Sequence, residues 1–373
     1  MIEKFETSIQ QHGFIGDTTL PKLVYLTLIS ALFDTPVSLL IKGPASAGKS
    51  YALACAKRYV PEDGYEQFEA MSERALAYLG AQLDLRHKTL ILQEAAGMAG
   101  GAGRVFLRQL LTEGQIRYAT VQSTRDGLQG VELPVVEGPC GLIMTTTANR
   151  IHHEDETRML TFHIDEGSEH IRAILEGMAN GLRTSEPSED ELKAFHQLYE
   201  ELRETTPEVS VPFQSEIAQG LPLSHPRILR DFPKVITLVK ALALLHSNER
   251  ERDNSGTVIA TKADYETVRQ LIDNSLAYGL EIAIPEGLRR VVEAVGEMEA
   301  QSTVPDMSCF RASQREIAAY MGLDPSVVSR HVHRAVEMEL LRDENPGQGR
   351  HAELRVGSQP LPTSSVLPVL SSS

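Results

Sequence analysis

The sequence predicts an α/β fold in which a parallel β-sheet lies between two layers of helices. Five short apolar runs of the kind that form buried strands alternate with segments of helical periodicity. A glycine-rich loop joins the first of these runs to a helix, in the order typical of a phosphate-binding loop. The expected strands are residues 37–41, 65–68, 89–94, 141–147 and 160–165.

Four segments are expected along the 373 residues, a length that suits two or three domains. Residues 1–168 form the three-layer α/β domain, and residues 169–300 have the helical pattern of a second, lid-like domain. A linker leads to a compact domain at 308–357. The remainder, 358–373, is rich in Pro and Ser and is expected to be a disordered tail.

The composition is that of a globular protein with a strong negative charge. Hydrophobic residues make up 42% and the net charge is −15, so the surface is not coated with the Lys and Arg that contact phosphates, and any DNA contact must be local. No apolar run approaches the roughly 20 residues that cross a bilayer, and a signal peptide is not recognised, so we expect a cytoplasmic protein with no membrane partner. Three widely spaced cysteines are expected as buried thiols: Cys55, Cys140 and Cys309.

Before the first strand, residues 20–33 have the apolar spacing of a helix that packs on the sheet. After it, residues 43–50 match the pattern G-x-x-x-x-G-K-[ST] and lead into an expected helix at 51–59. Glycines at both ends let successive N–H groups face phosphate oxygens, Lys49 would reach the outer phosphates, and Ser50 would ligate Mg²⁺. The alternative is a glycine turn that merely joins strand to helix. The expected nucleotide-binding residues are Gly43, Pro44, Ala45, Ser46, Ala47, Gly48, Lys49, Ser50 and Tyr51.

The strand at 89–94 runs apolar and ends in Gln93 and Glu94. An acidic residue in this place, beside a phosphate loop, can orient or deprotonate an attacking water. Here the chain resembles the AAA+ ATPases, because the loop, this strand and the strand end Thr145-Thr146-Thr147-Ala148-Asn149 follow in that family's order. The resemblance implies ATP as the nucleotide, Glu94 as the water activator, and Thr147 or Asn149 as the sensor that positions the water.

One position departs from the family pattern, which has Asp where this chain has Gln93. An amide cannot supply a carboxylate, although its carbonyl can hold a Mg²⁺-bound water. Metal binding should therefore depend more on Ser50 and on the phosphates, and hydrolysis could be slow. A nucleotide switch that does not hydrolyse is the alternative, and Glu94 favours hydrolysis.

Arg158 stands just ahead of the fifth strand, where the resemblance places an arginine finger. An arginine at that rim of the sheet reaches a neighbouring subunit's phosphate more easily than its own, so the resemblance implies a homo-oligomeric ring, most often a hexamer. With Lys49 and Glu94 it completes the expected catalytic set. The alternative is a surface arginine paired with Asp155 or Glu156.

The helical segment contains His225-Pro226-Arg227-Ile228-Leu229-Arg230-Asp231 before a long apolar-faced helix. This resembles the lid of the family with its sensor arginine, for which Arg227 is the first choice and Arg230 the second. A helix-start arginine that is solvated or paired with Asp231 is the alternative.

Residues 116–136 predict a β-hairpin with Asp-Gly at its turn, inserted ahead of the fourth strand. It is similar to the pre-sensor hairpin of the minichromosome-maintenance-like branch of AAA+ motors, which includes self-loading helicases of mobile elements. That similarity implies a DNA-gripping loop in a ring pore, with Arg117 and Arg125 as basic candidates. A structural or oligomerisation hairpin is equally open.

In the last domain, a helix capped at Ser313 ends at Gly322, and a second helix starts at Asp324-Pro325. Two polar strands with a turn-rich tip follow, and the whole resembles a winged helix, which implies DNA contact. Because acidic residues offset the arginines, a protein-binding or ring-packing role stays open. The expected DNA-binding residues are Ser326, Ser329, Arg330, His333 and, on the wing, Arg350 with His351.

The sequence and the resemblance together favour an ATP-hydrolysing AAA+ ring that acts on DNA as a replication-type helicase or translocase. Two alternatives belong to other classes: a nucleotide-gated DNA-binding loader or regulator, and a protein-remodelling ATPase.

Overall fold

The computed structural model describes most of the chain as two compact units, Met1–Leu280 with Ser365–Ser373, and Glu281–Ser364. Each unit is described by itself. The described residues are 1–80, 82–93, 101–124, 127–147, 152–164, 168–180, 184–223, 225–280, 286–302, 310–345, 347, 352–359, 361 and 365–371.

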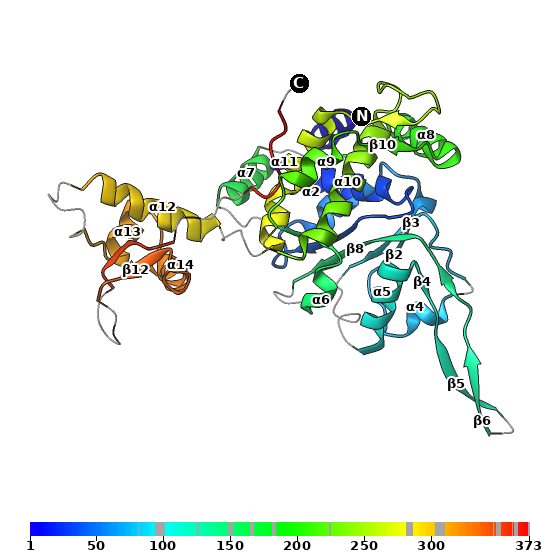
Figure 1. Cartoon of the computed structure of the whole chain (residues 1–373), viewed down its shortest axis with the longest axis horizontal. Coiled ribbons are helices and arrows are strands. Elements are labelled where there is room, and N and C mark those ends of the chain that lie inside the picture. Colours follow the sequence, from blue (N-terminus) through cyan, green and yellow to red (C-terminus); the bar gives the residue numbers. More distant parts are fainter. Residues whose placement is uncertain are drawn as a thin grey trace. The chain divides into compact units, whose positions relative to one another are not determined.

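A five-stranded parallel sheet forms the centre of the first unit (Figure 1). Each pair of neighbouring strands runs parallel, as predicted for an α/β domain. The middle strand, β8, lies between the first strand and β3, so the chain crosses over the sheet rather than adding strands in sequence order. In spatial order the strands are β2 (Tyr65–Phe68), β3 (Lys88–Leu92), β8 (Cys140–Thr146), β1 (Ser38–Lys42) and β9 (Leu160–His163).

Helices cover both faces of this sheet, because both side-chain sets of its strands are apolar. Leu40 and Leu142 belong to a core with α4 (Ala75–Tyr78) and α5 (Gly101–Glu113). The alternate residues of β1 and β8, such as Leu39, point to the opposite face and are also buried. That face carries α2 (Thr19–Ser30), which packs on α3 (Lys49–Lys57).

An antiparallel hairpin is inserted between α5 and β8, as the sequence predicts. Its base is β4 (Gln115–Ile116) paired with β7 (Val136–Glu137), and its arm is β5 (Ala119–Thr124) paired with β6 (Gly127–Glu132). Thr124 and Gly127, the first and last residues of the predicted turn, pair with each other, and Arg125 and Asp126 lie outside the described residues. Figure 1 shows the arm extending away from the sheet.

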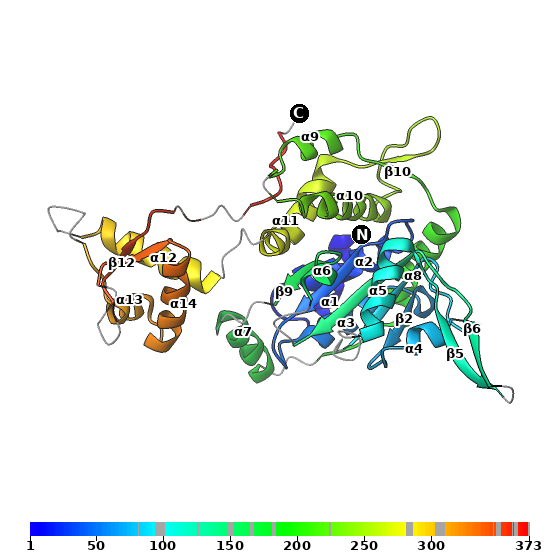
Figure 2. The same ribbon diagram turned by 60° about the horizontal axis from the view of Figure 1, so that its bottom comes forward.

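Within the segment 169–300, predicted as a helical lid domain, the helices up to Leu280 belong to the same compact unit as the sheet. The long helices α10 (Ile228–Leu245) and α11 (Lys262–Gly279) lie on each other, and both contact α2 (Figure 2). The apolar face of α10 buries Val235, Leu238 and Leu242. The other elements of this unit are α1 (Ile2–Gln11), the 3₁₀ turn η1 (Glu62–Gly64), α6 (His153–Glu156), α7 (Ser168–Ala179), α8 (Glu189–Thr205), β10 (Val209–Ser210), α9 (Gln214–Gln219) and β11 (Val258–Ile259).

The second unit has the helix pair that the sequence predicts. Ser313 and Glu316 form a capping box on the first helix, which ends at Gly322 with φ 65°. Asp324 caps the next helix and Pro325 opens it. Its elements are α12 (Glu286–Ala300), α13 (Gln314–Met321), α14 (Pro325–Glu337) and the antiparallel strands β12 (Leu341–Asp343) and β13 (Leu354–Val356).

Helix α12 differs from expectation, since the sequence predicts it as the end of the lid. Its buried residues Leu288, Val291 and Val295 share a core with Ile317 and Val328 of the α13–α14 pair. The boundary between the two units therefore falls near residue 280 rather than near 300.

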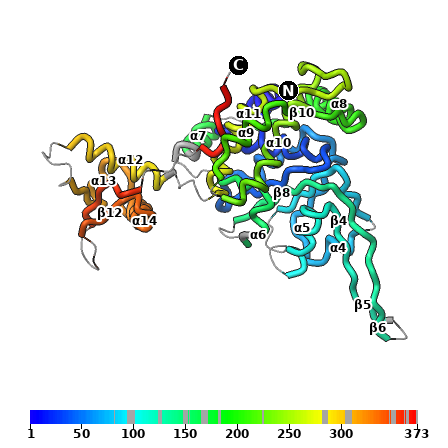
Figure 3. Tube along the Cα trace, viewed as in Figure 1, coloured from blue at the N-terminus to red at the C-terminus, as the bar shows by residue number. Residues whose placement is uncertain are grey.

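The expectation of a disordered tail from 358 is wrong for residues 365–371. This segment lies on the first unit beside α9, in red in Figure 3, and buries Val366 and Leu367. Two apolar side chains with a place to pack outweigh the Pro- and Ser-rich composition. In the described part of the chain, no helix combines the length and the hydropathy that a membrane span requires.

Candidate functional site

The glycine loop connects β1 to α3 at the carboxyl edge of the sheet. Gly48 has φ 84° and is the N-cap of α3, and Ser46 also lies in the left-handed region with φ 66°. A side chain at position 48 would meet no atom within 4 Å, so the space in front of the loop is open. Left-handed turns before a helix direct successive N–H groups outward, which suits an anion at the helix N-terminus.

Lys49 sits over this loop and is nearly buried, with 9% of its surface exposed. Its Nζ donates to the carbonyl oxygens of Gly43 at 2.7 Å and Pro44 at 2.6 Å. The ammonium group is therefore held at the loop by its own backbone. A phosphate oxygen entering the loop would find a positioned cation and the partial positive charge of the α3 N-terminus.

Two further predicted residues lie at the same edge of the sheet. The Gly43 N–H donates to the carbonyl of Thr146, which sets Thr147 beside the start of the loop. One strand further, the Gln93 N–H donates to the carbonyl of Phe68. Glu94 and Asn149, the predicted water activator and second sensor, lie outside the described residues.

The structure adds an aromatic pair at the loop that the sequence did not indicate. Ser50 and Tyr51 are exposed at the start of α3, and the ring of Phe14 stacks on Tyr51 with centroids 5.7 Å apart. Phe14 lies far from the loop in sequence and follows no spacing pattern with it, so only the folded chain brings the rings together.

Arg158 lies at the amino ends of the strands, opposite the phosphate loop. It precedes β9 by two residues, and Leu160, the first residue of β9, is in register with Leu39. Leu39 is four residues before Gly43, about 13 Å along the strand. Arg158 donates to Thr112 Oγ1 at 2.6 Å. Burial lowers the pKa of its guanidinium below the usual value, and nearby Arg230 and Arg108 lower it further.

The acidic neighbours that could have paired with Arg158 are engaged elsewhere. Asp155 accepts from Arg104 at 2.5 Å and from Arg108 at 3.2 Å. Glu156 forms an ion pair with Lys42 at 2.7 Å, and both side chains are largely buried. Arg158 therefore belongs to a cluster of arginines rather than to a local ion pair.

The structure does not bring the two predicted lid arginines to the phosphate loop. Arg227 Nη1 donates to the Gly279 carbonyl at 2.9 Å, and its Nε pairs with buried Asp231 at 3.1 Å. Arg230 donates to Thr157 Oγ1 at 2.6 Å, next to Arg158. Both guanidinium groups thus form their hydrogen bonds near the amino ends of the strands.

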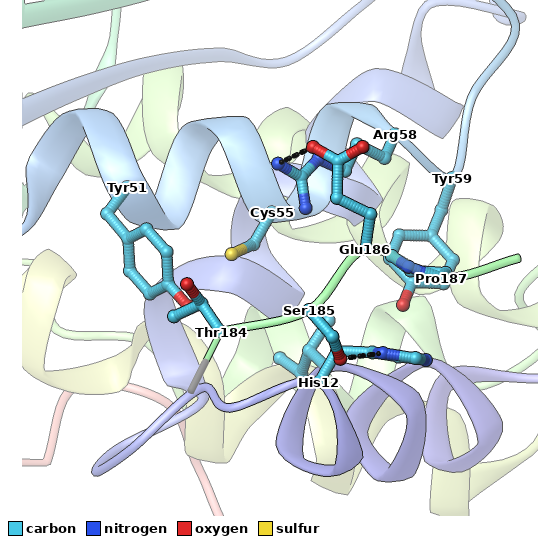
Figure 4. Close-up of a pocket in the computed structure, with 10 residues that line it drawn as sticks. His12, Tyr51, Cys55, Arg58, Tyr59, Thr184, Ser185, Glu186 and Pro187 are labelled. Atoms are coloured by element: carbon cyan, nitrogen blue, oxygen red, sulfur yellow. Dashed lines mark hydrogen bonds and ion pairs between the residues drawn. The ribbon is translucent and has the colours of Figure 1, made fainter. Parts of the chain in front are cut away.

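A cavity of about 210 Å³ lies on the flank of α3, between that helix, the end of α1 and residues 184–187 (Figure 4). Its charged groups are paired: His12 Nδ1 lies 2.7 Å from Ser185 Oγ, and Arg58 donates to Glu186 at 3.0 Å. Burial raises the pKa of the Cys55 thiol in its wall. These described groups of the cavity wall therefore bond to one another.

The predicted DNA contacts fall in two separate regions. On the hairpin, Arg117 pairs with Glu132 at 3.2 Å, and Val121 and Leu128 are strongly exposed on the arm. On α14 of the second unit, Arg330 and His333 are exposed, and His333 lies 3.3 Å from Glu337.

The two serines of α14 differ from each other. Ser326 is exposed but bonds to its own helix cap, Asp324, at 2.5 Å, and Ser329 is half-buried. The predicted contacts Arg125, Arg350 and His351 lie outside the described residues.

A family model described as the MTBMA_p00010 P-loop domain matches residues 1–205. No curated protein matches the chain. Among solved structures, the chain is similar at TM-score 0.38 and 10% identity to "SCCmec type IV Cch - active helicase", with 91% of this chain aligned and 66% of that one, just under two thirds.

Two further structures have similar coverage and lower scores. The Aeropyrum pernix ORC1 protein in complex with DNA aligns at TM-score 0.29 and 11% identity over 91% of this chain and 88% of that one. A Thermotoga maritima RuvB mutant aligns at TM-score 0.30 and 12% identity over 92% and 94%. Scores of this size do not identify a shared fold.

Proposed function

The chain belongs to the MTBMA_p00010 P-loop domain family through residues 1–205, and from this premise we propose that it is an AAA+ motor that hydrolyses ATP and acts on DNA. The observation that carries the proposal is the phosphate loop: an open, left-handed turn at Gly48 with the Lys49 ammonium held over it. A P-loop NTPase uses such a turn to hold the outer phosphates of its nucleotide.

The residues at the loop fit a nucleotide and its Mg²⁺. Ser50 presents an exposed hydroxyl at the first turn of α3, and Gln93 supplies an amide oxygen at the same edge of the sheet. Both are oxygen donors, which Mg²⁺ prefers, and in the described chain no cluster of three His, Cys, Asp or Glu side chains offers an alternative metal site. When bound, Mg²⁺ would neutralise charge on the phosphates.

The sheet order supports a polar sensor next to the nucleotide. Strand β8 lies between β1 and β3, so Thr147 follows the strand adjacent to the loop while Gln93 follows the next one. In the proposal, Lys49 binds the phosphates, Thr147 holds the attacking water in line, and Glu94 takes its proton.

The position of Arg158 is our reason for proposing a ring. The phosphate loop of its own chain lies at the opposite ends of the strands, and the nearby Asp155 and Glu156 form ion pairs with other residues, so we assign Arg158 to the nucleotide of an adjacent subunit. The adjoining Arg230 and Arg108 would add positive charge to the same surface. A hexamer is the expected assembly.

Two elements would contact DNA in this proposal. The hairpin arm would line the ring pore, and the second unit, with its helix pair and its two-stranded sheet, would be a winged helix that presents Arg330 and His333. The arm's described residues are mainly uncharged, so it would hold DNA through shape and hydrogen bonds more than through charge.

The proposal is tested by ATPase activity with and without single-stranded and duplex DNA, together with the mass in the presence of ATP. We expect DNA-stimulated turnover by a multi-subunit species, and loss of nucleotide binding in Lys49→Ala. A monomer whose activity ignores DNA would overturn both the ring and the motor.

A second candidate function is a nucleotide-gated DNA-binding regulator, which Gln93 specifically favours because it removes a carboxylate from the metal site. For a regulator, ATP should change DNA affinity while strand displacement and translocation are absent. Unwinding or movement along DNA would favour the motor.

A further inference from the structure

A short segment of the chain, residues 365–371 with a bend at Leu367, is seated on the first unit in the manner of a bound peptide. One oxygen of Asp273 on α11 accepts two successive backbone N–H groups, from Val366 at 2.8 Å and Leu367 at 2.7 Å. Charge-assisted bonds of this kind are stronger than bonds between neutral groups. They fix the backbone direction of the segment on the helix.

The next residues are held by their carbonyl groups. Tyr265, about two turns before Asp273 on α11, donates its hydroxyl to the Pro368 carbonyl at 2.8 Å. Lys262 donates to the Ser371 carbonyl at 2.8 Å. Along α11, the acceptor Asp273 thus binds N–H groups of the segment, and the donors Tyr265 and Lys262 bind its carbonyl groups. Recognition of this type depends on main-chain groups and leaves specificity to pockets for individual side chains.

The side chains supply that specificity. Val366 and Leu367 are 4% and 1% exposed, whereas Val369 points to solvent at 74%. At the end of α9, a Cβ on Gly220 would approach the Pro368 ring to 2.5 Å, so only glycine leaves room for this proline. The surface is therefore shaped for the sequence Val-Leu-Pro.

We propose that the surface formed by Gly220, Tyr265, Asp273 and Lys262, the α9–α11 groove, is a docking site for a Val-Leu-Pro peptide, and that residues 365–371 of the same chain are its resident ligand. This proposal does not depend on the proposed function.

Docking of residues 365–371 affects the second unit, because the same chain connects the two. Residues 281–364 leave the first unit after Leu280, and the chain returns to it at Ser365. While the groove is filled, the second unit is tethered at both of its ends, and release leaves it tethered at one. Because the segment belongs to the same chain, its effective concentration at the groove is high. A contact of only seven residues can therefore be occupied most of the time and still dissociate reversibly.

The first test measures binding of a fluorescent peptide with the sequence of residues 365–371. In the full chain carrying Leu367→Asp, the resident segment should leave the groove, and the peptide should bind at least tenfold more tightly than to wild type. Adding Asp273→Asn should weaken that binding at least tenfold, whereas Glu266→Gln, a matched change on the same helix, should not. Equal binding to wild type and Leu367→Asp, or no binding to the variant, would overturn the proposal.

A second measurement does not require a variant that releases its segment. Amide hydrogen exchange on the wild type should show protection of Val366 and Leu367, and Asp273→Asn should lose it while the amides of α11 stay protected. Protection should be independent of protein concentration for a segment docked within its own chain. Exposed amides, or protection that rises with concentration as for a segment from a second copy, would contradict the assigned occupant.

Discussion

At the scale of single residues, the chemistry of this chain depends on a few cations whose neighbours determine what each can do. Lys49 is held over the phosphate loop by two carbonyl groups, and Arg158 lies beside Asp155 and Glu156, which form ion pairs with other residues. In the proposed function, each of these cations would bind a phosphate: Lys49 that of its own nucleotide and Arg158 that of a neighbour's.

Arg158→Ala should leave nucleotide binding unchanged and reduce turnover on the order of 10³-fold, because an arginine finger acts on transition-state charge. Nucleotide affinity and steady-state ATPase rates are the measurements. Arg86→Ala, which removes an exposed arginine paired with Asp84, is the control and should keep wild-type rates. Wild-type turnover in Arg158→Ala would remove the finger assignment.

Lys42→Met should destabilise the first unit by about 3 kcal/mol, since it leaves the largely buried Glu156 carboxylate without its ion pair. Denaturant unfolding of each variant measures the change. The double variant Lys42→Met with Glu156→Gln should recover part of the loss, because no unpaired charge remains. If the double variant is as unstable as the sum of two independent losses, the pair is not coupled.

At the scale of elements, the helix ends of α13 and α14 lie where the local sequence predicts them. The caps of α13 and α14 were readable because a capping box, a left-handed glycine and an N1 proline act within one turn. Helix α11 has a further capping box, in which Thr261 and Asp264 bond to each other's backbone. Burial alone would raise the pKa of Asp264, but hydrogen bonds from His246, Arg250 and Thr261 outweigh it and hold that pKa well below its usual value.

Asp264→Asn should therefore lower stability at neutral pH by about 2 kcal/mol, as expected for lost hydrogen bonds to a charged group. Because the folded pKa is depressed, the contribution is complete above the unfolded pKa near 4 and is lost as the pH falls below it. Unfolding free energies of the wild type and the variant should converge from pH 5 toward pH 3. A constant difference across that range would show that ionisation of Asp264 is not its source.

At the scale of the whole molecule, the two edges of the sheet separate two roles. The carboxyl edge holds the phosphate loop, Gln93 and Thr147, and the amino edge holds Arg158 beside Arg230. If the proposed function holds, with Arg158 acting on the nucleotide, a complete catalytic site would therefore need two copies.

Mixing two inactive variants tests this division. Lys49→Ala cannot hold nucleotide but keeps its finger, and Arg158→Ala holds nucleotide but lacks the finger. If the finger acts between subunits, the mixture should regain activity that neither variant has alone, at protein concentrations where the ring forms. No recovery in mixtures shown by mass to contain both variants would place the finger's action within one chain or remove it.

The parallel sheet, the phosphate loop, the hairpin and the helix pair of the second unit could be predicted because each leaves a local pattern: apolar runs, glycines at set spacing, and caps. The pattern did not reveal how the later helices pack. Helices α10 and α11 join the sheet unit and α12 joins the second unit, because their apolar faces find partners far away in sequence. For the same reason, neither the pairing of Lys42 with Glu156 nor the stacking of Phe14 on Tyr51 could be foreseen.

The amino-acid sequence was sufficient to identify a P-loop domain, since a phosphate loop is made by eight consecutive residues and the two elements that flank them. The fold was needed to show which side chains share an edge of the sheet, to leave Arg227 bound to Gly279 rather than aimed at the loop, and to seat residues 365–371 on α11. The physical reason is the sequence distance between the interacting groups. Turns and caps are determined by interactions within a few residues, whereas burial, ion pairing and docking depend on groups that only folding brings together.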